Sequence, residues 1–155
     1  MQDRTTQSIN ILILKLILIL SWTRFTIQFL IYVYFQIDRA SLSINGDYNY
    51  CGGYGVKVTI YTHGGGTCTL SHGDFSTGDL IEWDKTTSNI EKLNCYIARG
   101  EKKIKFKFTT IQGTQEAFCP KKMYIKAGNE NFYQNFDYYS HDSSMDNKTF
   151  FATKD

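Results

Sequence analysis

The sequence predicts an all-β fold, an antiparallel β-sandwich with two disulfides preceded by an apolar N-terminal leader, with a small β-barrel as the alternative. Short segments after Ser41 alternate apolar and polar residues, which is the period of a half-buried strand. No segment after Ser41 shows a sustained helical period. Four cysteines, Cys51, Cys68, Cys95 and Cys119, all follow the leader.

The leader occupies residues 1–40 and contains two apolar runs, at 9–20 and 25–35. Lys15 interrupts the first run, and Arg24 lies between the two. A basic residue at the centre of a membrane helix costs roughly 2.5–3.5 kcal/mol, so one span covering both runs is disfavoured. Each run alone has about the length of a signal-peptide core. We expect a secreted protein with a cleaved signal peptide, an uncleaved signal anchor as the alternative, and a β-sandwich domain at 41–155.

The charge balance of the domain does not favour a nucleic-acid partner. The chain has 17 basic and 15 acidic residues. Four basic residues lie in the leader against Asp3 and Asp38, so basic and acidic residues are equal in number from Ser41 onward. A neutral domain lacks the basic footprint of nucleic-acid binding.

The first part of the domain contains two predicted strands. Residues 54–61 alternate, with Val56, Val58 and Ile60 on one face, and the glycines at 64–66 end this strand. Residues 80–83 form a short strand, and residues 84–89 form a polar turn.

The clearest alternation in the chain lies at residues 104–110. Ile104, Phe106 and Phe108 should face the core, while Lys103, Lys105 and Lys107 should face water. We predict a hairpin between this strand and residues 93–97. Further strands are expected at 123–125 and 150–153, with an aromatic segment at 132–139. The lysine side is a candidate surface for binding anionic lipid or glycan.

The cysteines predict two disulfides, because an even set behind an export signal is typical of an oxidised framework. Their wide spacing, without a CxxC pair, makes a zinc site unfavourable. Four cysteines allow three pairings, which the sequence does not distinguish. Each disulfide is expected to contribute about 2–4 kcal/mol.

Residues 64–83 combine glycines with acidic, histidine and aromatic residues, and they form the main candidate functional loop. Asp74, Asp79, Glu82 and Asp84 could offer oxygen ligands to Ca²⁺, which takes six to eight such ligands. Their spacing is not that of an EF-hand, and a solvated acidic loop is the more frequent explanation. Calcium is therefore the one cofactor that the sequence suggests.

The three histidines, His63, His72 and His141, could form a general-base or metal arrangement with Asp74 and Asp142. No serine lies in a nucleophile motif such as GxSxG, and disulfide formation would remove the thiols. The sequence therefore favours a non-catalytic protein, with a small secreted hydrolase or toxin-like protein as the alternative.

A glycosylation sequon is present at Asn147, followed by Lys148 and Thr149. In a eukaryotic secretory pathway this asparagine is an expected glycan acceptor.

The central segments resemble a divergent PLAT/LH2-type β-sandwich domain over residues 54–129. The resemblance rests on Asp74-Phe75, Gly78-Asp79 and Trp83 in the loop and following strand, on Leu93, and on Phe118, Met123 and Ile125 in the later strand. It implies a non-catalytic module that contacts lipid, a membrane or another protein, in some members with calcium.

Taken together, these observations predict an exported binding module that contacts a lipid or membrane surface or another extracellular protein. A membrane-tethered surface protein differs from this prediction only in the retention of the leader. The sequence makes no prediction of the oligomeric state.

Overall fold

The computed structural model describes residues 34–84, 86, 95–111, 117–136 and 147–155. The chain divides into the units Met1–Tyr34 and Phe35–Asp155, and the fold described below is that of the second unit. Within the described parts of the chain, no helix has the length and apolar content needed to cross a membrane.

The described residues form nine strands and one short 3-10 helix, and the neighbouring strands are antiparallel. In chain order they are β1 (Tyr34–Ile44), β2 (Gly55–Tyr61), η1 (His63–Gly65), β3 (Thr67–His72), β4 (Leu80–Asp84), β5 (Tyr96–Ala98), β6 (Lys103–Ile111), β7 (Pro120–Ala127), β8 (Glu130–Asn135) and β9 (Thr149–Lys154). Their order in the sheet is β3-β2-β6-β9-β8-β7-β1-β4, and β5 pairs with β1.

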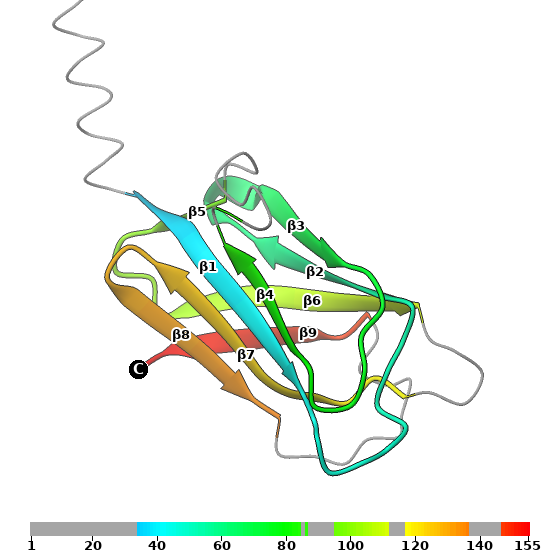
Figure 1. The fold of residues 1–155 in the computed structure, drawn as a ribbon. Coiled ribbons are helices and arrows are strands. Elements are labelled where there is room, and N and C mark those ends of the chain that lie inside the picture. Colours follow the sequence, from blue (N-terminus) through cyan, green and yellow to red (C-terminus); the bar gives the residue numbers. More distant parts are fainter. Residues whose placement is uncertain (1–33, 85, 87–94, 112–116, 137–146) are drawn as a thin grey trace, which may run out of the picture. The chain divides into compact units, whose positions relative to one another are not determined.

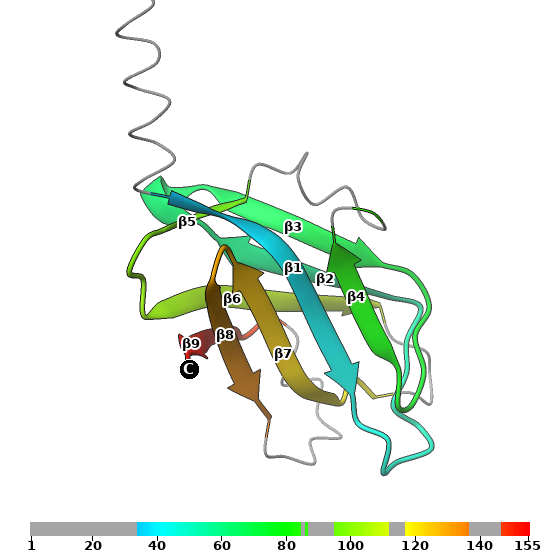
Figure 2. The same cartoon turned by 60° about the vertical axis from the view of Figure 1, so that its left-hand side comes forward.

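The sheet bends into two layers, and the short β5 lies beside β1 in one of them. Figures 1 and 2 show β4, β1, β7 and β8 side by side in one layer, with β3, β2, β6 and β9 in the other. Only two residue pairs, Phe132↔Lys154 and Tyr133↔Thr153, join the layers between β8 and β9. At the other side the indole Nε1 of Trp83 in β4 donates to the Ser71 carbonyl oxygen of β3 over 2.9 Å. The sandwich is thus nearly closed into a barrel, and the predicted all-β antiparallel fold is confirmed.

Aromatic side chains fill the space between the layers. Phe106 and Phe108 of β6 are fully buried, with ring centroids 5.3 Å apart. Phe108 also meets Phe118 edge to face at 4.9 Å. Such edge-on pairs contribute about 0.5–1.5 kcal/mol each beyond the area that they bury. The inward side of β6, as expected from its alternation, is the centre of the core.

Both predicted disulfides are present, as Cys51–Cys119 and Cys68–Cys95. Their Cα atoms are 5.4 and 5.5 Å apart, and the bridged residues are separated by 68 and 27 positions. Loops of these lengths correspond to about 4.4 and 3.6 kcal/mol in the chain-entropy description of cross-linking. Cys68–Cys95 links β3 to the chain before β5, so it fastens the two layers where no strand pairing joins them.

Most predicted strands are found, but the predicted hairpin between residues 93–97 and 104–110 is wrong. β5 pairs with β1 in one layer, whereas β6 pairs with β2 and β9 in the other. The turn closed by Glu101 N donating to the Ala98 carbonyl oxygen carries the chain between layers instead of reversing it within one. Residues 93 and 94 lie outside the described residues, as do 137–139 of the aromatic segment.

β1 starts inside the segment assigned to the leader. It begins at Tyr34, and Ile37 and Ala40 are fully buried. Ile37 N also donates to the Cys95 carbonyl oxygen over 2.8 Å, which places this part of β1 beside the second disulfide. Residues 35–40 therefore form part of the folded unit.

We predict that a protein starting at Tyr34 folds, whereas one starting at Ser41 does not fold or melts far lower. The shorter protein loses the buried Ile37 and Ala40 side chains. Removing one large buried aliphatic side chain costs about 2–5 kcal/mol, against a total stability of about 5–15 kcal/mol. Thermal unfolding followed by circular dichroism measures the difference. Equal melting temperatures would show that the first half of β1 is dispensable.

Candidate binding surface

The outward side of β6 presents a row of cations. Along β6, exposed or half-buried lysines at 103, 105 and 107 alternate with the buried Ile104, Phe106 and Phe108. Residues two apart on a strand lie about 6.6–6.8 Å apart along its axis. The predicted outward orientation of Lys103, Lys105 and Lys107 is confirmed.

The neighbouring strands add aromatic side chains and a fourth lysine to this row. In the register of β6 with β9, Lys105 lies opposite Phe151, whose side chain is 47% exposed. On β2, Lys57 and Tyr61 alternate with buried residues and face outward. The Lys105 Nζ lies over the Tyr61 ring, 4.6 Å from its centroid, at a distance typical of a cation–π contact.

We call this surface the lysine face and define it by four lysines and two aromatic residues. They are Lys57, Lys103, Lys105, Lys107, Tyr61 and Phe151. The sequence prediction missed Lys57, Tyr61 and Phe151. Alternation places Lys57 and Tyr61 on one face, but only strand pairing shows that β2 and β9 flank β6.

The two layers differ in charge. The strands β3, β2, β6 and β9 contain no aspartate or glutamate, so no strand residue of this layer brings a carboxylate to the lysine face. The other layer mixes both signs, with Asp38, Glu82, Asp84 and Glu130 among its basic residues. Charges of one sign on a surface raise the local concentration of oppositely charged ligands. The lysine face is therefore the side suited to an anionic partner.

The opposite face carries a different cluster, which the sequence analysis did not predict. Tyr124 and Tyr133 lie opposite each other in the β7–β8 register, with ring centroids 5.1 Å apart. The Lys122 Nζ is 4.2 Å from the Tyr133 centroid, and Tyr124 donates to Asn131 Oδ1 over 2.9 Å. Partial burial raises the pKa of Tyr124, and Tyr133 adds to this rise while Arg39 opposes it. The side chains of Tyr124 and Tyr133 thus already contact Asn131 and Lys122 within the protein.

The structure does not gather the four carboxylates of the predicted calcium loop. Asp79 Oδ2 accepts a hydrogen bond from Ser76 N over 2.7 Å, and Asp84 Oδ1 accepts one from Thr86 N over 2.8 Å. Glu82 forms an ion pair with Arg39 of β1, while Asp74 is exposed. Throughout the described ranges, no three His, Cys, Asp or Glu side chains form a group that could hold a metal ion.

The histidines are also separated. His63 lies in η1 before β3, and His72 is the last residue of β3. Both are exposed, and His63 precedes β3 while His72 ends it. His141 and Asp142 lie outside the described residues. The structure therefore does not bring His63 and His72 together, and an arrangement of the histidines with Asp74 and Asp142 stays a prediction.

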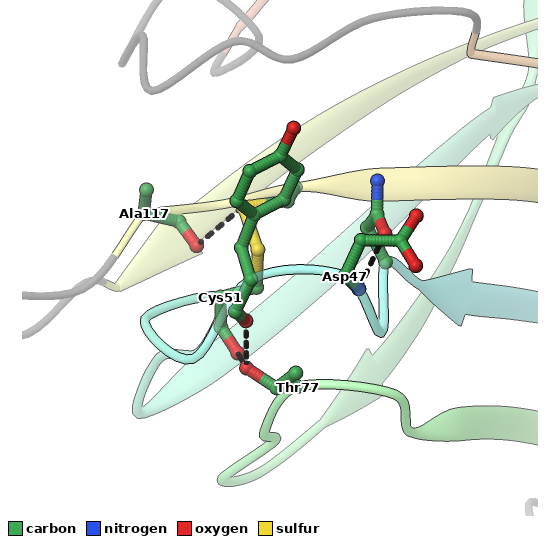
Figure 3. Close-up of a disulfide and its surroundings, with 7 residues drawn as sticks. Asp47, Cys51, Thr77 and Ala117 are labelled. Atoms are coloured by element: carbon green, nitrogen blue, oxygen red, sulfur yellow. Dashed lines mark hydrogen bonds between the residues drawn. A yellow bond between two sulfur atoms is a disulfide. The ribbon is translucent and has the colours of Figure 1, made fainter.

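The first disulfide fastens the loops at one end of the sandwich. Figure 3 shows Cys51 and its disulfide near Ala117 and Thr77. Thr77 Oγ1 lies 2.6 Å from the Tyr48 carbonyl oxygen and 3.1 Å from that of Cys51. Ala117 accepts from Gly52 N and donates to the Tyr50 carbonyl oxygen. Loops bound in this way hold neighbouring side chains in fixed positions.

Asn147 of the sequon is exposed and precedes β9 with a positive φ of 61°. Its backbone nitrogen donates a hydrogen bond to the Phe108 carbonyl oxygen over 2.9 Å. The side chain is accessible at the border of the lysine face, and glycosylation there stays a prediction.

Comparison of the chain with protein-family models and with curated proteins gives no match. The PLAT/LH2 resemblance therefore stays a prediction.

We predict that the melting temperature is the same in a chelator and in millimolar calcium, because the loop carboxylates do not converge on one point. Differential scanning calorimetry measures it. The Asp74→Asn, Asp79→Asn double variant is the control, and it should respond no differently. A calcium-dependent rise, about 2.7 kcal/mol at a hundredfold excess over the dissociation constant, would show that the loop rearranges around an ion.

Proposed function

We propose that this protein is an exported, non-catalytic binding module whose lysine face contacts the anionic surface of a lipid membrane. The observation that carries the proposal is the charge separation between the layers. Four lysines face outward from a layer whose strands contain no carboxylate. Each lysine near an anionic membrane contributes about 1 kcal/mol of attraction.

The exposed aromatic residues favour a membrane over a purely ionic partner. Phe151 is 47% exposed beside Lys105, and Tyr61 is half-buried beneath its ammonium group. Tyrosine is favoured at membrane interfaces because its ring is apolar and its hydroxyl group is hydrated, and phenylalanine there buries its apolar ring. A surface that combines both residue types suits the boundary between lipid headgroups and acyl chains.

Export is supported by the two disulfides, because such bonds form and persist in oxidising compartments. The apolar leader supports the same proposal through its composition. Whether the leader is cleaved or retained, β1 must be intact from Ile37 for its buried side chains to enter the core.

The proposal predicts that the protein sediments with vesicles of phosphatidylserine and phosphatidylcholine in equal amounts. The protein should start at Tyr34, since the apolar leader would itself partition into lipid. Lys105→Gln with Lys107→Gln should weaken binding by about 30-fold, because two lysines contribute about 2 kcal/mol. Added salt should weaken binding of the unmodified protein in the same direction.

The matched control is Lys122→Gln with Lys126→Gln, which removes the same charge from the outward side of β7 in the other layer. This control should bind the vesicles as the unmodified protein does. Equal weakening by both variants would show that net charge, and not the lysine face, governs binding. No association of the unmodified protein with the vesicles would contradict the proposal itself.

A further inference from the structure

The two most exposed large apolar residues of the described domain are backbone neighbours at one corner of the sandwich. Tyr54 is 63% exposed and Ile111 is 61% exposed, the two highest values among its large hydrophobic residues. Single exposed apolar residues are ordinary on protein surfaces, whereas adjacent ones indicate a contact site. The Tyr54 amide nitrogen donates to the Ile111 carbonyl oxygen over 2.8 Å, so these two residues are neighbours.

The corner adjoins the lysine face. Ile111 continues the outward alternation of Lys105, Lys107 and Thr109 along β6. It pairs with Gly55 of β2, and its Cδ1 atom lies 3.8 Å from the position that a Cβ at Gly55 would take. The missing side chain at Gly55 therefore leaves room for Ile111 to lie across β2, on the side from which Lys57 projects.

The backbone below the corner is fixed. Gly53 and Phe75 exchange two backbone hydrogen bonds of 3.1 and 3.0 Å. A Cβ at Gly53 would lie 2.8 Å from the Ile111 carbonyl oxygen and from Phe75 Cζ, so only glycine fits this approach. The nearby Cys51–Cys119 disulfide anchors the same loop. Tyr54 and Ile111 are thus held out from a rigid base, which lowers the entropy lost on binding.

We propose that Tyr54 and Ile111 form an apolar anchor that enters the headgroup and acyl boundary of an anionic bilayer while the lysine face lies against the headgroups. This inference rests on the proposed function and adds the orientation of the contact. The occupant is a bilayer and not a second copy of the chain, because two lysine faces carry charge of the same sign and repel each other. A polyanion without an apolar phase would leave both side chains in water.

Asp74 lies on the loop that brings Phe75 to Gly53, and it is exposed. Because Phe75 pairs with Gly53, which precedes Tyr54, the negative charge of Asp74 lies on a segment next to the anchor and opposes approach to anionic lipid. Asp74→Asn should therefore tighten vesicle binding, whereas a role as a bridging-cation ligand would make the same change weaken binding in calcium.

The test uses the full chain with a single reporter, Ile111→Trp, and vesicles of phosphatidylserine with acyl-brominated phosphatidylcholine. The control is Tyr96→Trp, which replaces an exposed aromatic residue at the start of β5. Both proteins keep the same leader and the same native Trp22 and Trp83, so those contributions cancel. The expected result is a larger blue shift and stronger bromine quenching for Ile111→Trp than for Tyr96→Trp.

A second measurement, on the protein that starts at Tyr34, uses Tyr54→Ser with Ile111→Ser, which should weaken vesicle binding on the order of tenfold or more. Both side chains are exposed, so folding should be retained, and circular dichroism checks it. An unquenched Ile111→Trp reporter on bound protein, or equal quenching of both reporters, overturns the anchor. If the anchor is overturned but binding still depends on Lys105 and Lys107, the proposed function stands. Failure of the anchor can therefore be told apart from failure of membrane binding by the lysine face.

Discussion

The alternation along β6 is the constraint on which the rest of the structure depends. β6 lies between β2 and β9, and its inward side supplies Ile104, Phe106 and Phe108 to the core. Because successive side chains of a strand point to opposite faces, burial of these residues forces the lysines outward. A shift of register by one residue would bury the lysines and expose the phenylalanines. The same pattern therefore stabilises the core and creates the charged surface.

A nearly closed sheet needs a fastening where its two edge strands meet. The edges are β3 and β4, which share the indole hydrogen bond from Trp83 to Ser71. The Cys68–Cys95 disulfide acts on the same side by joining β3 to the chain before β5. Exposed edge strands invite pairing with other chains, and covering them is one way in which proteins prevent it. The other disulfide, Cys51–Cys119, fixes the loops beside the apolar corner.

Local residue patterns could predict the strands but not their partners. Alternation located β2, β4 and β6, because each strand presents one apolar face to the core. The predicted hairpin failed because partner choice depends on contacts far apart in the chain, such as Ile37 with Cys95. The same limit hid the start of β1, whose apolar residues continue from the leader without a break. Lys103, Lys105 and Lys107 could be assigned to one face from sequence, whereas the contributions of Tyr61, Phe151 and Ile111 required the register of three strands.

The central claim is that the lysine face, and not the opposite side of the sandwich, contacts an anionic membrane. Amine-selective acylation of the folded protein, read by peptide mass spectrometry with and without phosphatidylserine vesicles, tests it at single residues. The account predicts slower modification of Lys57, Lys103, Lys105 and Lys107 in the presence of vesicles. Lys122 and Lys126 of β7 should react at the same rate in both conditions. Protection of Lys122 and Lys126 with unchanged reactivity on β6 would contradict it.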